Sequence, residues 1–192
     1  METPMPLPVL QTPRLTLRPR TIDDLDACVA MDLDPQVHRY IFARPPEPVA
    51  QRNAVKARMT SGAPAIGGYW MVLRRDEAAA LGWCALFPLE NSGQVELAYR
   101  YRPEAWGQGI ATEAARAVLD YGFGVLKLDP IVAVTHPENE GSKRVLAKLG
   151  FRYQGAATHY NRRVSTFRLF RASYLAKAAA GAKAAQVDKA VT

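Results

Sequence analysis

The segment VELAYRYRPEAWGQGIATEA, residues 95–114, contains the strongest indication of the fold. Its first seven residues alternate in the period of a β-strand, and Pro103 ends that strand because proline donates no backbone hydrogen bond. Gly107 and Gly109 then tolerate positive φ and a close approach of ligand to backbone. Helix-forming residues follow from Ile110. This order leaves free N–H groups at a helix start, where a phosphate or pyrophosphate can bind.

The glycine turn by itself does not identify a ligand. A Walker loop would need a Lys followed by Ser or Thr, and a dinucleotide fingerprint would need a third glycine at Thr112. A bare G-x-G before a helix is also typical of a plain strand-to-helix turn, and taken alone it favours that interpretation.

Length and composition predict one domain with short extensions. A chain of 192 residues is long enough to bury a core. We expect a leader at 1–12, the domain at 13–175 and an Ala/Lys-rich tail at 176–192. The proline-containing N-terminus does not resemble a signal peptide, and no apolar run has the length of a membrane span. We therefore expect no membrane partner.

Charge and cysteine usage narrow the function classes. The net charge of +7 fits an anionic ligand. The basic residues are scattered, so direct nucleic-acid binding is not expected, and an RNA- or ribosome-associated role is a weaker alternative. Cys28 and Cys84 lack metal or disulfide spacing, which predicts buried, reduced side chains in a cytoplasmic protein without a metal.

The apolar pattern predicts alternating strands and helices. Strands are expected at 14–18, 69–74, 81–87, 95–101, 130–134, from 151 onward, and 164–170. Helices are expected at 21–33, 49–60, 110–126 and 138–149, with Gly150 just after the last of them. The tail is expected to be helical at most.

A second segment, THPENEGSKRVLAKLGF at residues 135–151, is far more specific than the glycine turn. It contains the pattern N-x-x-S-x-x-V-L-x-K-L-G-F. With residues 106–114 it resembles the acetyl-CoA-binding core of the GNAT N-acetyltransferase superfamily. Residues 12–18, 82–87 and 95–101 resemble the branch named for ribosomal-protein N-terminal acetyltransferases. The resemblance covers about residues 10–175 and reverses the preference for a plain turn.

The resemblance implies an α+β, three-layer fold. Its mixed, mostly antiparallel sheet is flanked by helices, and the two central strands splay apart around the pantetheine arm. Asn139 should contact that arm or the neighbouring backbone, and Ser142 lies in the same motif. The backbone groups implied for the pantetheine amides are those of Tyr99, Arg100 and Tyr101. Those implied for the pyrophosphate are the N–H groups of Gly107, Gln108, Gly109, Ile110, Ala111 and Thr112.

Two positions depart from the superfamily pattern. Trp106 replaces the usual Gln or Arg, as is usual in the ribosomal-type branch. Leu146 stands where many relatives have a Tyr that protonates the leaving thiolate. The branch suggests Ser142 as the acid instead, with Tyr160 as a second candidate. Alternatively, the Ser142 hydroxyl bonds a cofactor group or the preceding turn.

The implied reaction is attack of an amine on a thioester, and the amine must first lose a proton. An α-amine with a pKa near 8 needs little help, whereas a Lys amine near 10.4 needs much more. Glu96 is the candidate base, directly or through water. The alternative is that Glu96 only pairs with Arg100. Strand N–H groups could polarise the thioester carbonyl.

The acceptor pocket is expected beside the loop that joins the first two helices. Its candidates are equally good core residues: Tyr40, Ile41, Phe42, Arg44, Trp70, His159 and Tyr160. His136 is expected to be a turn residue. The main hypothesis is an acetyl-CoA-dependent N-acetyltransferase that acts on a protein N-terminus or a small-molecule amine in a ternary complex, as monomer or homodimer. The alternative is a non-catalytic acyl-CoA-binding regulatory module.

Overall fold

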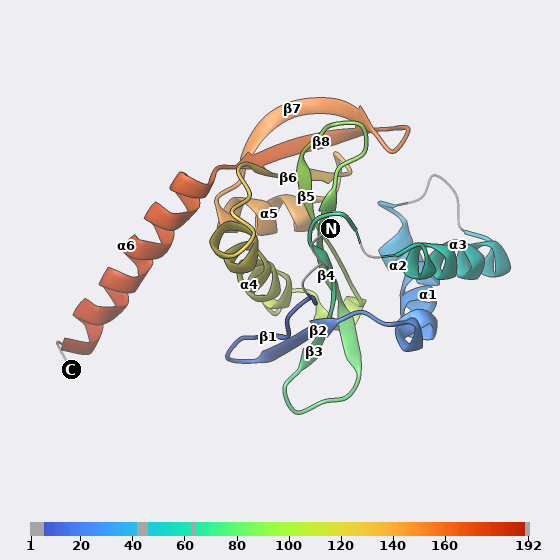
Figure 1. Ribbon diagram of the computed structural model, residues 1–192, viewed down its shortest axis with the longest axis horizontal. Coiled ribbons are helices and arrows are strands. Elements are labelled where there is room, and N and C mark those ends of the chain that lie inside the picture. Colours follow the sequence, from blue (N-terminus) through green and yellow to red (C-terminus); the bar gives the residue numbers. More distant parts are fainter. Residues whose placement is uncertain (1–5, 42–45, 63, 191–192) are drawn as a thin grey trace.

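The fold is built on one eight-stranded sheet with the order β1-β2-β3-β4-β5-β6-β8-β7 (Figure 1). The structure is a computed structural model that describes residues 6–41, 46–62 and 64–190, with side chains described up to residue 180. The strands are β1 Leu10–Gln11, β2 Leu15–Pro19, β3 Gly68–Arg74, β4 Ala80–Pro88, β5 Val95–Tyr101, β6 Ile131–Thr135, β7 Arg152–His159 and β8 Arg162–Leu169. The helices are α1 Leu25–Leu33, α2 Pro35–His38, α3 Pro48–Thr60, α4 Ile110–Gly124, α5 Glu140–Leu149 and α6 Arg171–Ala190, with 3₁₀ turns η1 Ile22–Asp24 and η2 Pro103–Ala105.

The two central strands of the sheet separate, as the resemblance implies. Strands β5 and β6 are parallel and pair only at Val95 with Ile131 and at Glu96 with Val132. Strand β5 then continues to Tyr101 without β6 beside it. The other strand pairs that the structure describes are antiparallel. The predicted α+β class with a mostly antiparallel, splayed sheet is confirmed.

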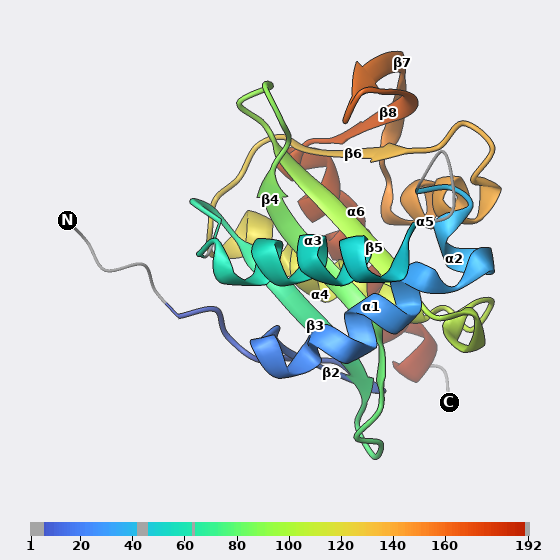
Figure 2. The same ribbon diagram turned by 90° about the vertical axis from the view of Figure 1, so that its right-hand side faces the viewer.

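Helices cover both faces of the sheet and form two apolar layers. Figure 2 shows α1 and α3 crossing in front of the central strands, with α4 behind them. Helix α4 buries residues three and four apart, including Ala114, Val118 and Tyr121, against one face. The opposite layer packs α1 and α3 on Met71, Trp83 and neighbouring strand residues. Burial of each large apolar side chain contributes about 1.5–3 kcal/mol.

The hairpin that joins β7 to β8 was only partly predicted. His159 pairs with Arg162, so Tyr160 and Asn161 form a two-residue turn. Both turn residues have positive φ, 53° and 55°, which a type I′ turn requires. Because this turn contains no glycine, its sequence does not predict a hairpin clearly.

The other differences lie at element ends. Asp34 ends α1 as expected, but its side chain also accepts a hydrogen bond from the Gln36 N–H and starts the short helix α2. Helix α6 is continuous and projects away from the sheet (Figure 1). It begins on the body, where Tyr174 packs on Phe123. The division of the chain at residue 175 therefore falls within one helix and stays a prediction.

Candidate active site

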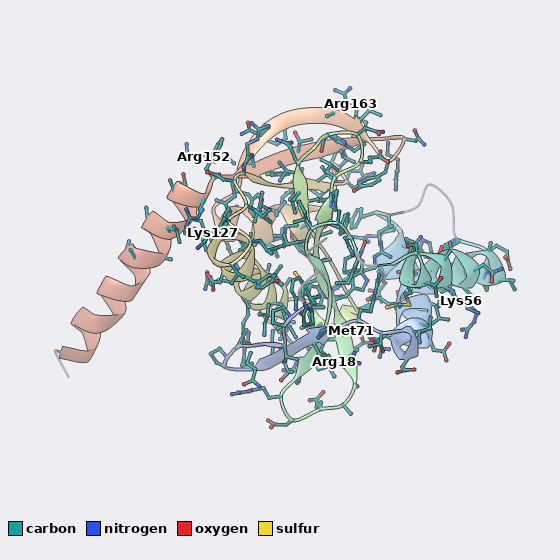
Figure 3. The ribbon with its side chains drawn as sticks, in the orientation of Figure 1. Arg18, Lys56, Met71, Lys127, Arg152 and Arg163 are labelled. Atoms are coloured by element: carbon teal, nitrogen blue, oxygen red, sulfur yellow. The ribbon has the colours of Figure 1, made fainter. Side chains whose placement is uncertain are left out.

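A cleft of about 1100 Å³ opens where β5 and β6 part. One end is lined by the starts of α4 and α5, and the other by residues of α1, α3, β3, β4 and the β7–β8 hairpin. The labelled Lys56, Lys127 and Arg163 do not line the cleft and lie on α3, in the loop after α4 and on β8, respectively (Figure 3). All three are exposed. The cleft is therefore the place where the predicted site residues can act together.

The glycine turn before α4 has the open backbone that a pyrophosphate needs. Gly107 and Gly109 have φ of 74° and 77°, and Gly109 is the residue that caps α4. A Cβ at Gly107 would meet nothing within 4 Å, and one at Gly109 would meet only Arg14 Nη2 at 3.5 Å. The turn therefore owes its glycines to backbone conformation and not to crowding. Its shape fits a phosphate group at the helix start.

The predicted pyrophosphate residues do not all face the cleft. Residues 107 and 109–112 line it, whereas Gln108 does not. The Gln108 side chain donates to the Glu104 carbonyl at 2.5 Å and accepts a hydrogen bond from Arg74. Arg14 donates to the Gln108 carbonyl at 3.1 Å. These bonds hold the turn from the side away from the cleft.

The edge of β5 beyond Glu96 lies open to the cleft. Tyr99, Arg100 and Tyr101 line the cleft and pair with β4 on their other side. One predicted backbone group already has a partner, because Trp106 Nε1 donates to the Tyr101 carbonyl at 3.0 Å. Trp106 thus connects the end of β5 to the glycine turn. The remaining edge suits hydrogen bonding to an extended chain with amide groups.

The start of α5 places two hydroxyl groups together in the cleft. Asn139 caps the helix, with Oδ1 accepting from the Ser142 N–H at 3.0 Å. Of the two roles implied for Asn139, the bond to neighbouring backbone is the one present in the structure. Ser142 Oγ lies 3.0 Å from the Tyr99 hydroxyl. Sequence reasoning assigned only the backbone of Tyr99, so its hydroxyl is an addition to the site.

Leu146 lies one turn further along α5 and is 1% exposed. It lines the cleft and belongs to the core that packs between α5 and the sheet. An aliphatic side chain there supplies packing and no proton. Burial raises the pKa of Tyr99, so its hydroxyl stays protonated at neutral pH.

Glu96 lies where β5 and β6 separate and is 3% exposed. Its Oε2 accepts a hydrogen bond from the Tyr160 hydroxyl at 2.5 Å. Burial raises the pKa of Glu96 to about 7, although hydrogen bonds from Tyr160 and from the Val134 backbone lower it. A carboxylate with a pKa near 7 can accept and release a proton at neutral pH.

The alternative interpretation of Glu96 paired it with Arg100, but the ion pair of Arg100 in the structure is with Asp32. Arg100 forms an ion pair with Asp32, which is 2% exposed and also accepts from Gln51 Nε2 at 2.6 Å. The guanidinium also lies 5.2 Å from the centre of the Trp83 ring. Asp32 was not among the predicted site residues.

The acceptor side of the cleft agrees only partly with prediction. Tyr40, Ile41, His159 and Tyr160 line it. Phe42 and Arg44 lie outside the described residues. His136 is the expected turn residue, because its Nδ1 accepts from the Glu138 N–H at 3.2 Å.

Of the two interpretations left open for Trp70, the structure supports the core residue and not the acceptor pocket. It is fully buried in the α4 layer, 5.5 Å from the Tyr121 ring, and its Nε1 donates to the Pro8 carbonyl at 2.8 Å. Successive side chains of a strand point to opposite faces. The neighbouring Tyr69 therefore lines the cleft in place of Trp70.

Other site classes find no support in the part of the chain that the structure describes. It contains no group of three or more His, Cys, Asp or Glu side chains that could hold a metal ion. Among the same residues, no helix combines the length and apolar character needed to cross a bilayer. Cys28 and Cys84 are free and buried, as predicted.

Comparisons with known proteins agree with this geometry. A family model described as an acetyltransferase (GNAT) domain matches residues 14–152. The uncharacterized N-acetyltransferase YoaA of Bacillus subtilis (strain 168) is 34% identical over 157 residues, which are 80% of this chain and 88% of the relative. A GNAT-family acetyltransferase structure from Bacillus anthracis has a TM-score of 0.71 and 26% identity, covering 85% of this chain and 99% of its own.

A spermidine N-acetyltransferase from Vibrio cholerae, solved with CoA and spermine, shares the fold. Its TM-score is 0.68 at 20% identity, and the match covers 85% of this chain and 99% of that one. The family uses acetyl-CoA as its acetyl donor, and the open glycine turn and the splayed strands fit that donor. This chain therefore belongs to the GNAT acetyltransferase family and is an N-acetyltransferase.

Proposed function

We propose that the protein transfers the acetyl group of acetyl-CoA to a primary amine by direct attack in a ternary complex, with Glu96 as the base. The observation that carries this proposal is the position of Glu96. It is a buried carboxylate in the cleft at the point where β5 and β6 separate. Bound acetyl-CoA would supply the thioester that the amine attacks.

The surroundings of Glu96 favour proton transfer at neutral pH. Burial raises its pKa to about 7. This value brings the carboxylate closer to the pKa of an amine, and a base whose pKa is near the working pH contributes about 10²–10⁴ in rate. Tyr160 fixes one carboxylate oxygen, and Glu90 accepts a hydrogen bond from the Tyr160 N–H. The hairpin turn thus orients the base.

Ser142 and Tyr99 form the proton-donating pair of the proposed mechanism. Their oxygens are 3.0 Å apart, so a proton given by one hydroxyl can be replaced from the other. Tyr160 hydrogen-bonds the base and is less suited to the role of acid. Because a thiolate is already a fair leaving group, the contribution of this pair should be small compared with that of Glu96.

Free CoA release tests the proposal directly. The purified protein should release CoA from acetyl-CoA in the presence of suitable amines, and Glu96→Gln should lose turnover while keeping its affinity for CoA. Glu138→Gln is a matched control, because Glu138 is exposed and does not line the cleft. The alternative of a non-catalytic binding module predicts CoA binding without turnover in all three proteins.

Three finer assignments belong to the same proposal. Trp106 and the resemblance of residues 12–18, 82–87 and 95–101 support membership of the branch named for ribosomal-protein N-terminal acetyltransferases. The two buried, free cysteines support a cytoplasmic location. The protein acts on its amine as a monomer or homodimer, and the amine is a protein N-terminus or a small molecule.

A further inference from the structure

The acceptor side of the cleft contains more guanidinium groups than carboxylates. Arg20, Arg58 and Arg100 line it together with the carboxylates of Asp32 and Glu96. Each of these groups except Asp32 influences the pKa of the same neighbour, the Tyr69 hydroxyl. Burial raises the pKa of Tyr69, Glu96 adds to this rise, and the three arginines lower the pKa. Three guanidinium groups thus face two carboxylates on this side of the cleft.

The single carboxylate of Asp32 is shared between two of these arginines. It forms an ion pair with Arg100, and its Oδ2 lies 3.9 Å from Arg58 Nη2. Gln51 bonds the same Oδ2 at 2.6 Å. Asp32 carries one negative charge, which Arg100 and Arg58 share.

Arg20 is partly buried and lies on an aromatic ring. Its guanidinium carbon is 3.8 Å from the centre of the Tyr69 ring, and Tyr69 stacks on Phe87 with ring centres 5.2 Å apart. Within the described part of the chain, Arg20 forms no ion pair with a carboxylate. An arginine remains protonated in proteins. Asp24 is close enough for Arg20 to help lower the pKa of its carboxyl group, but both Asp24 oxygens accept hydrogen bonds from Arg18, so Arg20 has a carboxylate nearby without an ion pair to it.

We infer that the acceptor is a primary amine that also carries an anionic group, a carboxylate or a phosphate, which Arg20 binds beside Tyr69. The inference rests on the proposed acetyl transfer and names its substrate class. A planar guanidinium suits either anion, because it can donate two parallel hydrogen bonds. A polyamine would place further positive charge beside Arg20, Arg58 and Arg100, which is unfavourable.

Paired amines that differ only in the anionic group test the inference on the full-length protein. CoA release is measured for phenylalanine against phenethylamine, for O-phosphoethanolamine against ethanolamine, and for spermidine, with rates expressed per concentration of neutral amine. We expect kcat/KM at least about 10-fold higher for the acid-bearing member of at least one pair. The two pairs distinguish a carboxylate from a phosphate.

Variants link that preference to the arginine. Arg20→Gln should reduce the preference about 10-fold or more by raising KM for the acid-bearing amine. The change in kcat/KM for the partner amine that lacks the acid group should be much smaller. Arg20→Lys should keep part of it. Arg52→Gln is the matched control, because Arg52 is exposed, pairs with Asp26 and does not line the cleft. If Arg20→Gln does not fold, Arg58→Gln takes its place, since Arg58 is exposed on α3.

A preference for spermidine or for the neutral members would overturn the inference and leave the proposed acetyl transfer intact. An anion preference that Arg20→Gln and Arg58→Gln leave unchanged would also overturn it. Thermal shift with CoA and phenylalanine or O-phosphoethanolamine is the second readout. An Arg20-dependent rise in Tm without CoA release would support the anion site while contradicting the proposed reaction.

Discussion

The substitution Glu96→Gln should change how the stability of the protein depends on pH. The folded state holds the Glu96 proton more tightly than the unfolded chain, because burial raises the pKa from 4.5 to about 7. Between these pH values the folded protein keeps a proton that the unfolded chain has lost. The free energy of unfolding must therefore fall as pH rises through this range. Gln cannot ionise, so the free energy of unfolding of the variant should lack the decrease that comes from Glu96.

The size of the effect follows from the two pKa values. A pKa difference from 4.5 to about 7 corresponds to about 3 kcal/mol of unfolding free energy. The full contribution of Glu96 is present below about pH 4.5 and is lost above about pH 7. Relative to the wild type, Glu96→Gln should therefore gain about 3 kcal/mol between about pH 4.5 and pH 8. Gln can still accept the Tyr160 hydrogen bond, which limits other changes.

Urea unfolding at a series of pH values measures the effect. The quantity to compare is the free energy of unfolding of the variant minus that of the wild type at each pH, because this difference cancels the titration of all other groups. Glu138→Gln, at an exposed position, is the matched control. A flat difference for Glu96→Gln would refute the raised pKa of Glu96 and the reasoning that makes it a base at neutral pH.

Three further predictions concern the turn, the buried ion pair and the proposed acid. Gly109→Ala should cost about 1–2 kcal/mol in urea unfolding because φ is positive there, and calorimetry should show weaker CoA binding. Gly124→Ala at the end of α4, with ordinary φ, should cost nothing. Asp32→Asn should cost about 3–5 kcal/mol in urea unfolding by removing the negative charge from the buried ion pair with Arg100, whereas the exposed Asp26→Asn should cost at most about 1 kcal/mol. Ser142→Ala should lower kcat about 10-fold in steady-state assays with little change in KM for acetyl-CoA, which is less than the usual contribution of about 10²–10⁴ from general acid catalysis because a thiolate leaves readily.

Each of these predictions has a result that contradicts it. Equal effects of Gly109→Ala and Gly124→Ala on CoA affinity would argue against the turn as a phosphate site. Equal effects of the two aspartate substitutions on the free energy of unfolding would mean that the contribution of Asp32 to stability does not come from its burial and its ion pair. A larger KM for acetyl-CoA with unchanged kcat in Ser142→Ala would assign that hydroxyl to binding.

Local sequence signals accounted for most of the fold. The alternation from Val95 to Tyr101 and the glycines at 107 and 109 act through neighbouring residues, so β5, the turn and the start of α4 were predictable. Gly150 likewise has the positive φ expected after α5. The splay of β5 and β6 came from the family resemblance, because no local pattern encodes where two strands stop pairing.

The parts of the site that were missed depend on contacts between distant residues. Tyr160 and Glu96 are 64 residues apart, and Arg100 and Asp32 are 68 apart. Such pairs form only after the sheet and helices have assembled. The exchange of Trp70 for Tyr69 has a different cause, since alternation shows that the two side chains face opposite layers but not which layer contains the cleft.

The central claim, acetyl transfer with Glu96 as the base, is tested most directly by the pH dependence of kcat/KM. The rate of CoA release should be measured from about pH 5 to pH 9 with one amine that the enzyme acetylates. Each rate should be expressed per concentration of the neutral form of that amine. The wild type should then show a rise with an apparent pKa near 7, the value to which burial raises Glu96. Glu96→Gln should be slower and lose that rise, whereas an unchanged rate and profile in the variant would contradict the account.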